Sequence, residues 1–240
     1  MKKFFPIGII TGALILGLAT SSFASPSNKL EMENYSPSKL SDDNSIELKM
    51  NREKESKEIE ADVIVNSKNL TLNSLKKYQK KMPSYFKKLK SEGYASVPAT
   101  ITFNETISFA KFEEIMNDSK VDINRIFVRT KSMSDGSLGA LTIAVEDNVV
   151  NSEKLKSILN GPVELEVVGV YAAEGSIKTK EKTFETLTEN NNIFLVDVSK
   201  QVIENQITSS KEFKNDKTKD KKLHIDVNVY DIFWELQQVK

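Results

Sequence analysis

The chain has 240 residues, of which 39% are hydrophobic and 28% are charged, and its 34 basic residues balance 34 acidic residues. This composition is typical of a globular protein with one large domain or two small ones, and zero net charge gives no global field that favours nucleic acid. The sequence contains no cysteine, which excludes disulfides, thiol nucleophiles, iron–sulfur sites and cysteine-based zinc sites.

Residues 1–24 have the pattern of a signal peptide. Two lysines precede an uncharged run from Phe4 to Leu18, and small residues follow at Ser22 and Ala24. This order predicts cleavage between Ala24 and Ser25, and therefore export to the cell surface or beyond it. The alternative is a retained membrane anchor, because the apolar run is only slightly shorter than a membrane span.

Residues 25–68 are polar and poor in aromatic side chains. Their segments SDDNS and NREKESKEIEAD offer too little apolar surface to offset the entropy lost on ordering. We therefore expect a flexible polar linker between the cell surface and the folded part of the chain.

Residues 69–94 predict a basic amphipathic helical segment. Apolar residues recur at steps of three and four positions, and Gly93 suits the end of a helix. Pro83 disfavours one continuous helix, so we expect two short helices that meet near it. The lysines indicate a solvated outer face over an apolar stripe on the core. In the alternative, the lysine-rich helix contacts an anionic wall or membrane surface or another exported protein.

Residues 95–240 predict a single α+β domain. The patterns indicate, in chain order, a strand near 99–103, a helix near 109–116, strands near 124–130 and 140–146, a helix near 151–162 and a strand near 163–173. This order is the βαββαβ motif of ferredoxin-like folds. A further helix and strand follow between 174 and 199. We expect a mixed β-sheet with helices on one face, a ferredoxin-like core extended by a further βαβ unit, and a C-terminal strand.

A faint internal repeat runs through this domain. ITFNETIS, a helix and IFV resemble VYAAEGSIK, a helix and IFLVDV, and Ile107 and Ile177 hold equivalent places. Two copies of a βαβ unit explain this similarity.

The C-terminal stretch KLHIDVNVYDIFWELQQVK contains the only histidine and the only tryptophan, His224 and Trp234. Apolar residues alternate with polar ones from Leu223 to Tyr230, which predicts a half-buried strand with His224 on its polar face. We expect the aromatic residues that follow to cover one end of the sheet, so the Trp–Phe pair is interpreted as core rather than as a ligand platform.

No motif for catalysis, cofactor binding or metal binding is found. One histidine without cysteine cannot build an ordinary transition-metal site. Glu113, Glu114 and Asp135 are typical surface residues, and Asp216 and Asp220 lie in a lysine-rich segment typical of a solvated loop. The sequence therefore predicts no catalytic, cofactor-binding or metal-binding residue, and no nucleic-acid partner or small-molecule cofactor.

Two pieces of the chain resemble a known family. ATITFNETISFAKFEEI, and VVGVYAAEG followed by NIFLVDVS, are similar to the extracytoplasmic C-terminal domain of Gram-positive sigma-factor-regulator (anti-sigma-like) proteins. The resemblance implies an exported sensory or scaffold domain and carries over no site residues.

The function expected from the sequence is binding or regulation, without catalysis, at the bacterial cell surface. Two alternatives remain. One is a protease-inhibitor or propeptide-like module, because ferredoxin-like units serve in that role. The other is a cell-wall or carbohydrate hydrolase, which a pocket with two or more close carboxylates would favour.

Overall fold

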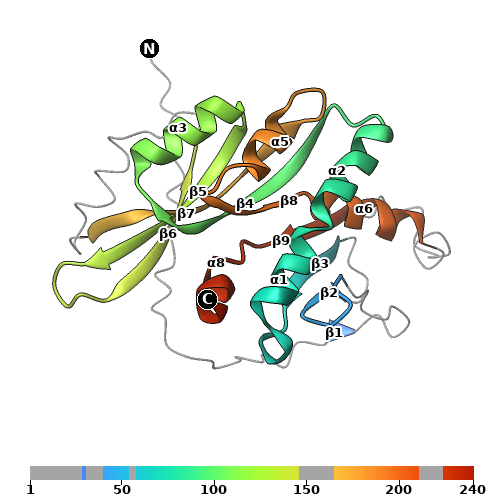
Figure 1. Cartoon of the computed structure of the whole chain (residues 1–240). Helices are drawn as coiled ribbons and strands as arrows, with labels where there is room; N and C mark the ends of the chain where they lie inside the picture. The colour runs from blue at the N-terminus through green and yellow to red at the C-terminus, as the bar shows by residue number, and fades with distance from the viewer. Residues whose placement is uncertain (1–28, 31–39, 54–57, 146–164, 211–223) are drawn as a thin grey trace, which may run out of the picture.

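The computed structural model describes residues 29–30, 40–53, 58–145, 165–210 and 224–240. These residues form two sheets, one with the order β1-β2-β3-β9 and one with the order β6-β5-β7-β4-β8, together with several helices (Figure 1). The predicted α+β fold class is confirmed. No helix of the described part has the length and apolar character needed to cross a membrane. The predicted signal peptide, residues 1–24, lies outside the described residues.

The elements and their bounds are, in chain order, β1 (Lys29–Leu30), β2 (Ile46–Glu53), β3 (Glu58–Val65), η1 (Ser67–Asn69), α1 (Leu72–Gln79), α2 (Met82–Ser91), β4 (Ser96–Ile107), α3 (Phe109–Ser119), β5 (Asp122–Ser132), β6 (Leu138–Ala144), β7 (Leu165–Lys178), α5 (Thr183–Thr188), β8 (Ile193–Asp197), α6 (Ser199–Ser209), β9 (His224–Val229) and α8 (Phe233–Val239).

The large sheet contains two interleaved βαβ units. In β4-α3-β5 the two strands flank β7, and in β7-α5-β8 the two strands flank β4, so each unit is split by one antiparallel strand of the other. These are the two segments of the internal repeat. The sequence pattern predicts a different motif, in which β6, a helix near 151–162 and β7 follow β4-α3-β5. Residues 151–162 lie outside the described residues, and β6 is an edge strand beside β5.

Every pairing in the large sheet is antiparallel, which corrects the predicted mixed sheet. Among the described strands, parallel pairing occurs between β3 and β9 of the small sheet. β9 is therefore the predicted C-terminal strand, but it joins a second sheet. The reason is its register with β3, which lets buried Val227 lie opposite buried Ala61.

Both faces of the large sheet carry helices. β4 alternates between Ile101 and Phe103 on one face and Thr100 and Thr102 on the other. Phe103 meets Phe112 of α3 edge to face, with 6.1 Å between ring centroids, whereas Thr102 accepts a hydrogen bond from the backbone N–H of Ile232 just before α8. Figure 1 shows α3 and α5 on one side of the sheet and α8 on the other. The prediction of helices on one face is thus incomplete.

The predicted linker of residues 25–68 is wrong for 40–53 and 58–65. Within these ranges, Ile46–Glu53 and Glu58–Val65 pair as the antiparallel strands β2 and β3, with Ile46, Leu48, Ile59 and Ala61 buried. The reason is that apolar residues stand at every second position between charged ones, a strand pattern that the average composition of the segment hides. The hairpin packs on the same core as the rest of the chain and is not a separate unit.

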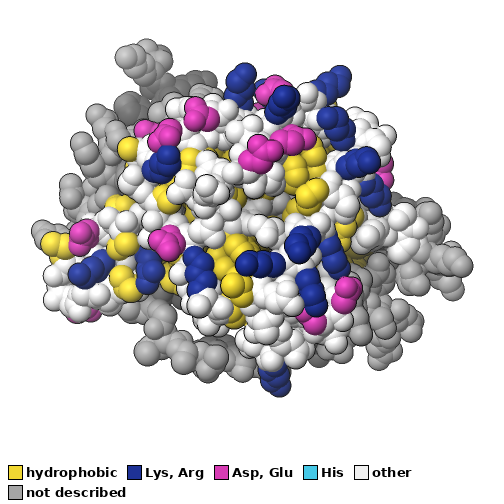
Figure 2. Space-filling model, in the orientation of Figure 1, with side chains coloured by type: hydrophobic (Ala, Val, Ile, Leu, Met, Phe, Trp, Pro, Cys, Tyr) yellow, Lys and Arg dark blue, Asp and Glu magenta, His cyan; other side chains and the backbone are white. Residues whose placement is uncertain are grey.

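Residues 69–94 form two helices that meet near Pro83, as predicted, and Gly93 follows α2 with a positive φ of 89°. The apolar stripe is buried in the common core, with Leu75, Tyr78 and Leu89 at 1% exposure or less. Figure 2 shows Lys and Arg side chains gathered over α1 and α2. The predicted lysine-covered outer face is therefore correct, although the helices belong to the same core as residues 95–240.

The segment after β9 connects the two sheets. Thr100 of β4 donates a hydrogen bond from Oγ1 to the carbonyl of Val229, at 3.0 Å. The chain then enters α8, where Ile232, Phe233 and Leu236 are buried and Trp234 is 38% exposed. The prediction that this segment covers the sheet is confirmed for Ile232, Phe233 and Leu236. Trp234 lies at the border of this cover and is partly exposed.

Candidate functional site between the two sheets

A cavity of about 290 Å³ lies where α1, the hairpin β2–β3 and the β9–α8 connection meet. Its walls combine aliphatic side chains with carboxyl and phenol groups. The lining residues are Ile46, Val63, Ile64, Val65, Tyr78, Asp197, Tyr230, Asp231, Ile232 and Glu235. An apolar cavity with a few convergent polar groups is the usual form of a ligand site in proteins.

The floor of the cavity contains a closed network around Asp197, the last residue of strand β8. Tyr78 donates its hydroxyl to Oδ2 of Asp197 at 2.7 Å, and the backbone N–H of Ser199 donates to Oδ1 at 2.8 Å. Burial raises the pKa of Asp197, although these hydrogen bonds oppose the shift. Burial and the neighbouring Asp197 carboxyl raise the pKa of Tyr78 well above its usual value.

This network does not resemble a nucleophilic centre. Tyr78 and Ser199 are at most 1% exposed, and the hydroxyl of Ser199 lies 3.1 Å from that of Tyr78. A phenol with a raised pKa remains protonated and cannot take a proton from a serine at neutral pH. The network therefore fixes α1 to the end of β8.

The border of the cavity carries Asp231 and Glu235, one helical turn apart at the start of α8. Burial, with smaller contributions from the nearby Glu235 and Glu174 carboxyls, raises the pKa of Asp231 to about 6, although the backbone N–H of Phe233 donates a hydrogen bond to this carboxyl at 3.1 Å and opposes the shift. Burial also raises the pKa of Glu235. Both carboxylates thus lie where their negative charge is poorly solvated.

No lysine or arginine is among the residues that line the cavity. The surroundings add more negative charge, because burial and then Asp62, Glu60 and Asp226 raise the pKa of Tyr230. Tyr230 donates a hydrogen bond to Oδ1 of Asp62 at 3.4 Å. In the described part of the chain, no three acidic or histidine side chains converge closely enough to hold a metal ion. The cavity is suited to a cationic group with an apolar stem.

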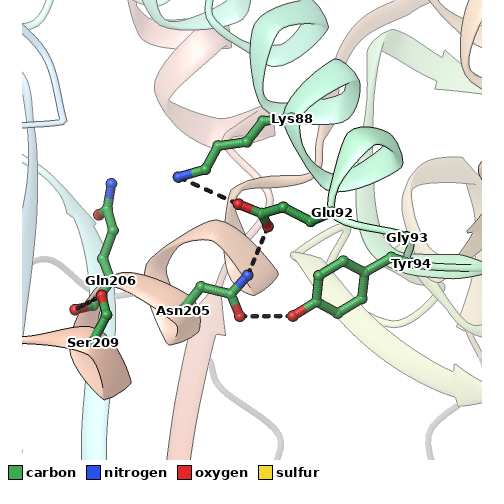
Figure 3. A pocket seen from close by; sticks show the side chains of 7 residues that line it. All are labelled: Lys88, Glu92, Gly93, Tyr94, Asn205, Gln206 and Ser209. Atoms are coloured by element: carbon green, nitrogen blue, oxygen red, sulfur yellow. Dashed lines mark hydrogen bonds and ion pairs between the residues drawn. The ribbon is translucent and has the colours of Figure 1, made fainter.

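A second, larger hollow of about 490 Å³ lies between the end of α2 and α6 (Figure 3). Asn205 accepts a hydrogen bond from the Tyr94 hydroxyl at 2.9 Å and donates one to Glu92 at 3.1 Å, and Glu92 faces Lys88 at 3.8 Å. These side chains satisfy one another across the hollow, as Figure 3 shows. The arrangement joins α2 to α6. The carboxyls of Asp231 and Glu235, whose pKa values are raised, belong to the other cavity.

The residues weighed in the sequence lie away from this cavity. His224 is exposed at the start of β9, as predicted, and Glu113 and Glu114 are exposed on α3. The Asp135 carboxyl accepts hydrogen bonds from the backbone and hydroxyl of Ser137, which lower its pKa to about 2 in an exposed turn. Asp216 and Asp220 lie outside the described residues.

Sequence reasoning missed the residues of the cavity. The available signal was Asp197, a charged residue within the otherwise apolar run IFLVDV. An acid in such a strand is rarely buried without partners, so it indicates a network. Asp231 and Glu235 gave a weaker signal, since their spacing of four is also typical of an exposed helix face.

Comparison with known proteins gives no assignment: no protein-family model, no curated protein and no solved structure matches this chain.

Proposed function

We propose that the protein is an exported, non-catalytic binding protein of the bacterial cell surface, and that its cavity holds a cationic group with an apolar stem. The observation that carries this proposal is Asp231. Its carboxylate is partly buried at a cavity that no lysine or arginine lines, and its pKa is raised to about 6. At neutral pH the free protein therefore keeps a poorly solvated charge at a cavity.

A buried acid without a counter-ion lowers the stability of the folded state. Such costs are typical of functional sites, where stability is given up for binding. A lysine side chain of a partner, or a small alkylamine, supplies the missing charge at Asp231 and Glu235 and places its methylene groups against Val63 and Ile232. This fit supports a partner protein that inserts a basic side chain.

The direct test is an NMR titration with N-acetyl-lysine methylamide and its neutral counterpart, N-acetyl-norleucine methylamide. We expect saturable shifts of the Val63 and Ile232 methyl signals with the lysine derivative alone. Asp231→Asn should weaken binding about tenfold, since it removes a charge-assisted contact. Binding should also weaken below pH 6, because Asp231 becomes protonated there.

The matched control is Glu113→Gln, an exposed acid on α3 far from the cavity in the sequence and the fold. It should leave the titration unchanged. Equal binding of both derivatives, or an Asp231→Asn variant that binds as the natural protein does, would show that the cavity does not recognise the charge.

The same carboxyls give the hydrolase alternative one specific support. A carboxyl with a pKa of about 6 can act as a general acid near neutral pH, and Glu235 is the nearby second carboxyl. The cavity of about 290 Å³ is at the lower end of ligand cavities and small for a sugar chain. Release of reducing ends from cell-wall glycan, abolished by Asp231→Asn, would favour this function over binding.

The place of action rests on the sequence pattern of residues 1–24. Under this proposal the chain is cleaved near Ala24–Ser25, and the exposed lysines of α1 and α2 face the anionic wall or membrane. The resemblance to anti-sigma-like regulators supports a sensory or scaffold role within the same proposal. N-terminal sequencing of the exported protein tests the cleavage: a first residue other than Ser25 would contradict it.

A further inference from the structure

A second surface is built around Arg129 in the middle of β5, where Trp234 of the first turn of α8 meets the large sheet. The residues paired with Arg129 on the neighbouring strands are Ala140 of β6 and Gly169 of β7. Neither has a side chain longer than a methyl group. The cross-strand positions on both sides of Arg129 therefore carry no long side chain that could contact its guanidinium.

Trp234 holds this guanidinium in place. The central carbon of the Arg129 guanidinium lies 5.0 Å from the centroid of the Trp234 ring, the geometry of a cation–π contact. Trp234 is itself fixed by Phe233 and Tyr171, with ring centroids at 5.3 and 5.4 Å. The arginine is thus preorganised by an aromatic cluster that is anchored in the protein.

Arg129 has no hydrogen-bond acceptor among the residues that the structure describes. Its Nε atom is shielded from solvent and has no partner in that part of the chain. By contrast Arg125, four residues earlier on the same strand face, donates from Nε to Glu174 at 2.8 Å. An unsatisfied buried donor costs free energy, and a planar carboxylate is the acceptor that matches a guanidinium best.

The surroundings of Arg129 are apolar and exposed. Of the six large hydrophobic side chains exposed in the described part of the chain, four lie at this end: Met133, Leu138, Val168 and Trp234. Lys131 is exposed on the same face, with Leu138 of β6 opposite it on one side and the exposed Glu166 of β7 opposite it on the other. Figure 2 shows hydrophobic and basic side chains side by side over the β5–β6 hairpin.

We propose that this surface, defined by Arg129, Lys131, Leu138, Val168 and Trp234, binds an acidic segment of another protein in which carboxylates alternate with apolar side chains. The carboxylates accept hydrogen bonds from Arg129, and the apolar side chains cover Leu138 and Val168. The exposed apolar side chains favour such a peptide over a phosphate polymer, which has no apolar groups to place on them. This inference is independent of the cavity and its cationic ligand.

The only tryptophan of the chain gives the test a direct signal. The full exported chain is titrated with a heptapeptide that alternates leucine or valine with glutamate, while Trp234 fluorescence is recorded. A second peptide replaces each glutamate by glutamine. We expect a saturable change with the glutamate peptide and at least about tenfold weaker binding of the glutamine peptide, because charge-assisted hydrogen bonds are lost.

The variants separate a site from a general charge effect. Arg129→Gln should weaken binding about tenfold, whereas the matched control Arg125→Gln should change it less than about twofold, because Arg125 is already paired with Glu174. Arg129→Lys keeps the charge without the planar fork and should give intermediate binding. Circular dichroism checks that each variant is folded.

Three results would overturn the proposal. Equal binding of the two peptides would show that the carboxylates are not recognised, and equal loss in the Arg125 and Arg129 variants would show that only net charge matters. Tighter, Arg129-dependent binding of inorganic polyphosphate or of phosphatidylglycerol vesicles would assign the surface to a phosphate-bearing ligand. Concentration-dependent dimers that Arg129→Gln dissolves would assign it to a second copy of this chain.

Discussion

The hydroxyl of Tyr78 donates to the buried carboxyl of Asp197, and this contact joins residues 119 positions apart in the chain. Among the described hydrogen bonds, Tyr78 is the donor to Oδ2 of Asp197, while the backbone N–H of Ser199 donates to Oδ1. At the residue scale, the structure thus depends on a few polar groups placed within an apolar core. Their removal has a larger effect than the number of atoms lost suggests.

Tyr78→Phe should lower the free energy of unfolding by about 1–3 kcal/mol, because Asp197 loses a donor while its burial persists. The control is Tyr85→Phe, a partly buried tyrosine on the neighbouring helix, which should change stability by less than about 0.5 kcal/mol. Urea unfolding of both variants measures the difference. Equal, small effects would mean that the network contributes little.

The aromatic pair of α8 should respond unequally to truncation. Phe233 is 1% exposed, so Phe233→Ala should cost about 3–5 kcal/mol through the cavity that it leaves. Trp234 is 38% exposed, and its loss should cost less, in contrast to the core position that the sequence suggested. Thermal unfolding of the two variants checks this order, and a Trp234→Ala variant as unstable as Phe233→Ala would reverse it.

At the scale of elements, the helices and strands follow closely from local chemistry. Ser108 caps α3 by accepting a hydrogen bond from the backbone N–H of Lys111. Pro83, in the first turn of α2, marks the break between α1 and α2 that the sequence predicts. The hairpin β2–β3 was missed because its apolar residues alternate within a highly charged segment. A count of residue types over the whole segment conceals a period of two, whereas position-by-position inspection reveals it.

The end of α3 offers a prediction at this scale. Lys120 follows the helix in the left-handed conformation, with φ of 56°, which glycine adopts without strain. Lys120→Gly should therefore raise stability by up to about 1 kcal/mol. The control Glu113→Gly, on the exposed face within the same helix, should lower stability by about 1 kcal/mol. Destabilisation by both substitutions, in urea melts, would contradict the left-handed conformation.

The hairpin β2–β3 should also be protected in solution. The backbone amides of Leu48, Ala61 and Val63 lie in strands that pair on the core, so they should exchange with deuterium as slowly as those of β4. Hydrogen-exchange mass spectrometry checks this expectation. Exchange as fast as in an unstructured peptide would restore the flexible linker that the composition predicted.

At the scale of the whole molecule, local patterns do not determine which strands become neighbours. The sequence indicates β4, β5, β6 and β7 correctly as strands, but it does not tell that β7 lies between β4 and β5 and that β6 is an edge. The cavity depends on such long-range choices. Its carboxyls come from β8, the β9–α8 connection and α8, and aliphatic residues of β2 and β3 contribute to its walls. Only folding brings these elements together.

Asp231 lies at a cavity that no lysine or arginine lines, and its uncompensated charge lowers the stability of the folded state. Its pKa of about 6 in the folded protein exceeds the usual 3.8, so the folded state binds the proton more tightly than the unfolded state does. Stability should therefore fall as the pH rises from about 4 to about 6, and remain lowered above that range. Replacement by the neutral asparagine removes this loss and keeps an oxygen that can accept from Phe233.

The most direct measurement is the free energy of urea unfolding of the natural protein and of Asp231→Asn between pH 4 and pH 8. The two proteins should be nearly equal at pH 4, and the variant should become more stable by on the order of 2–3 kcal/mol at pH 8. A variant that is less stable than the natural protein at pH 8 would contradict the account. The carboxylate would then stabilise the fold, and its position at the cavity would give no support for a bound cation.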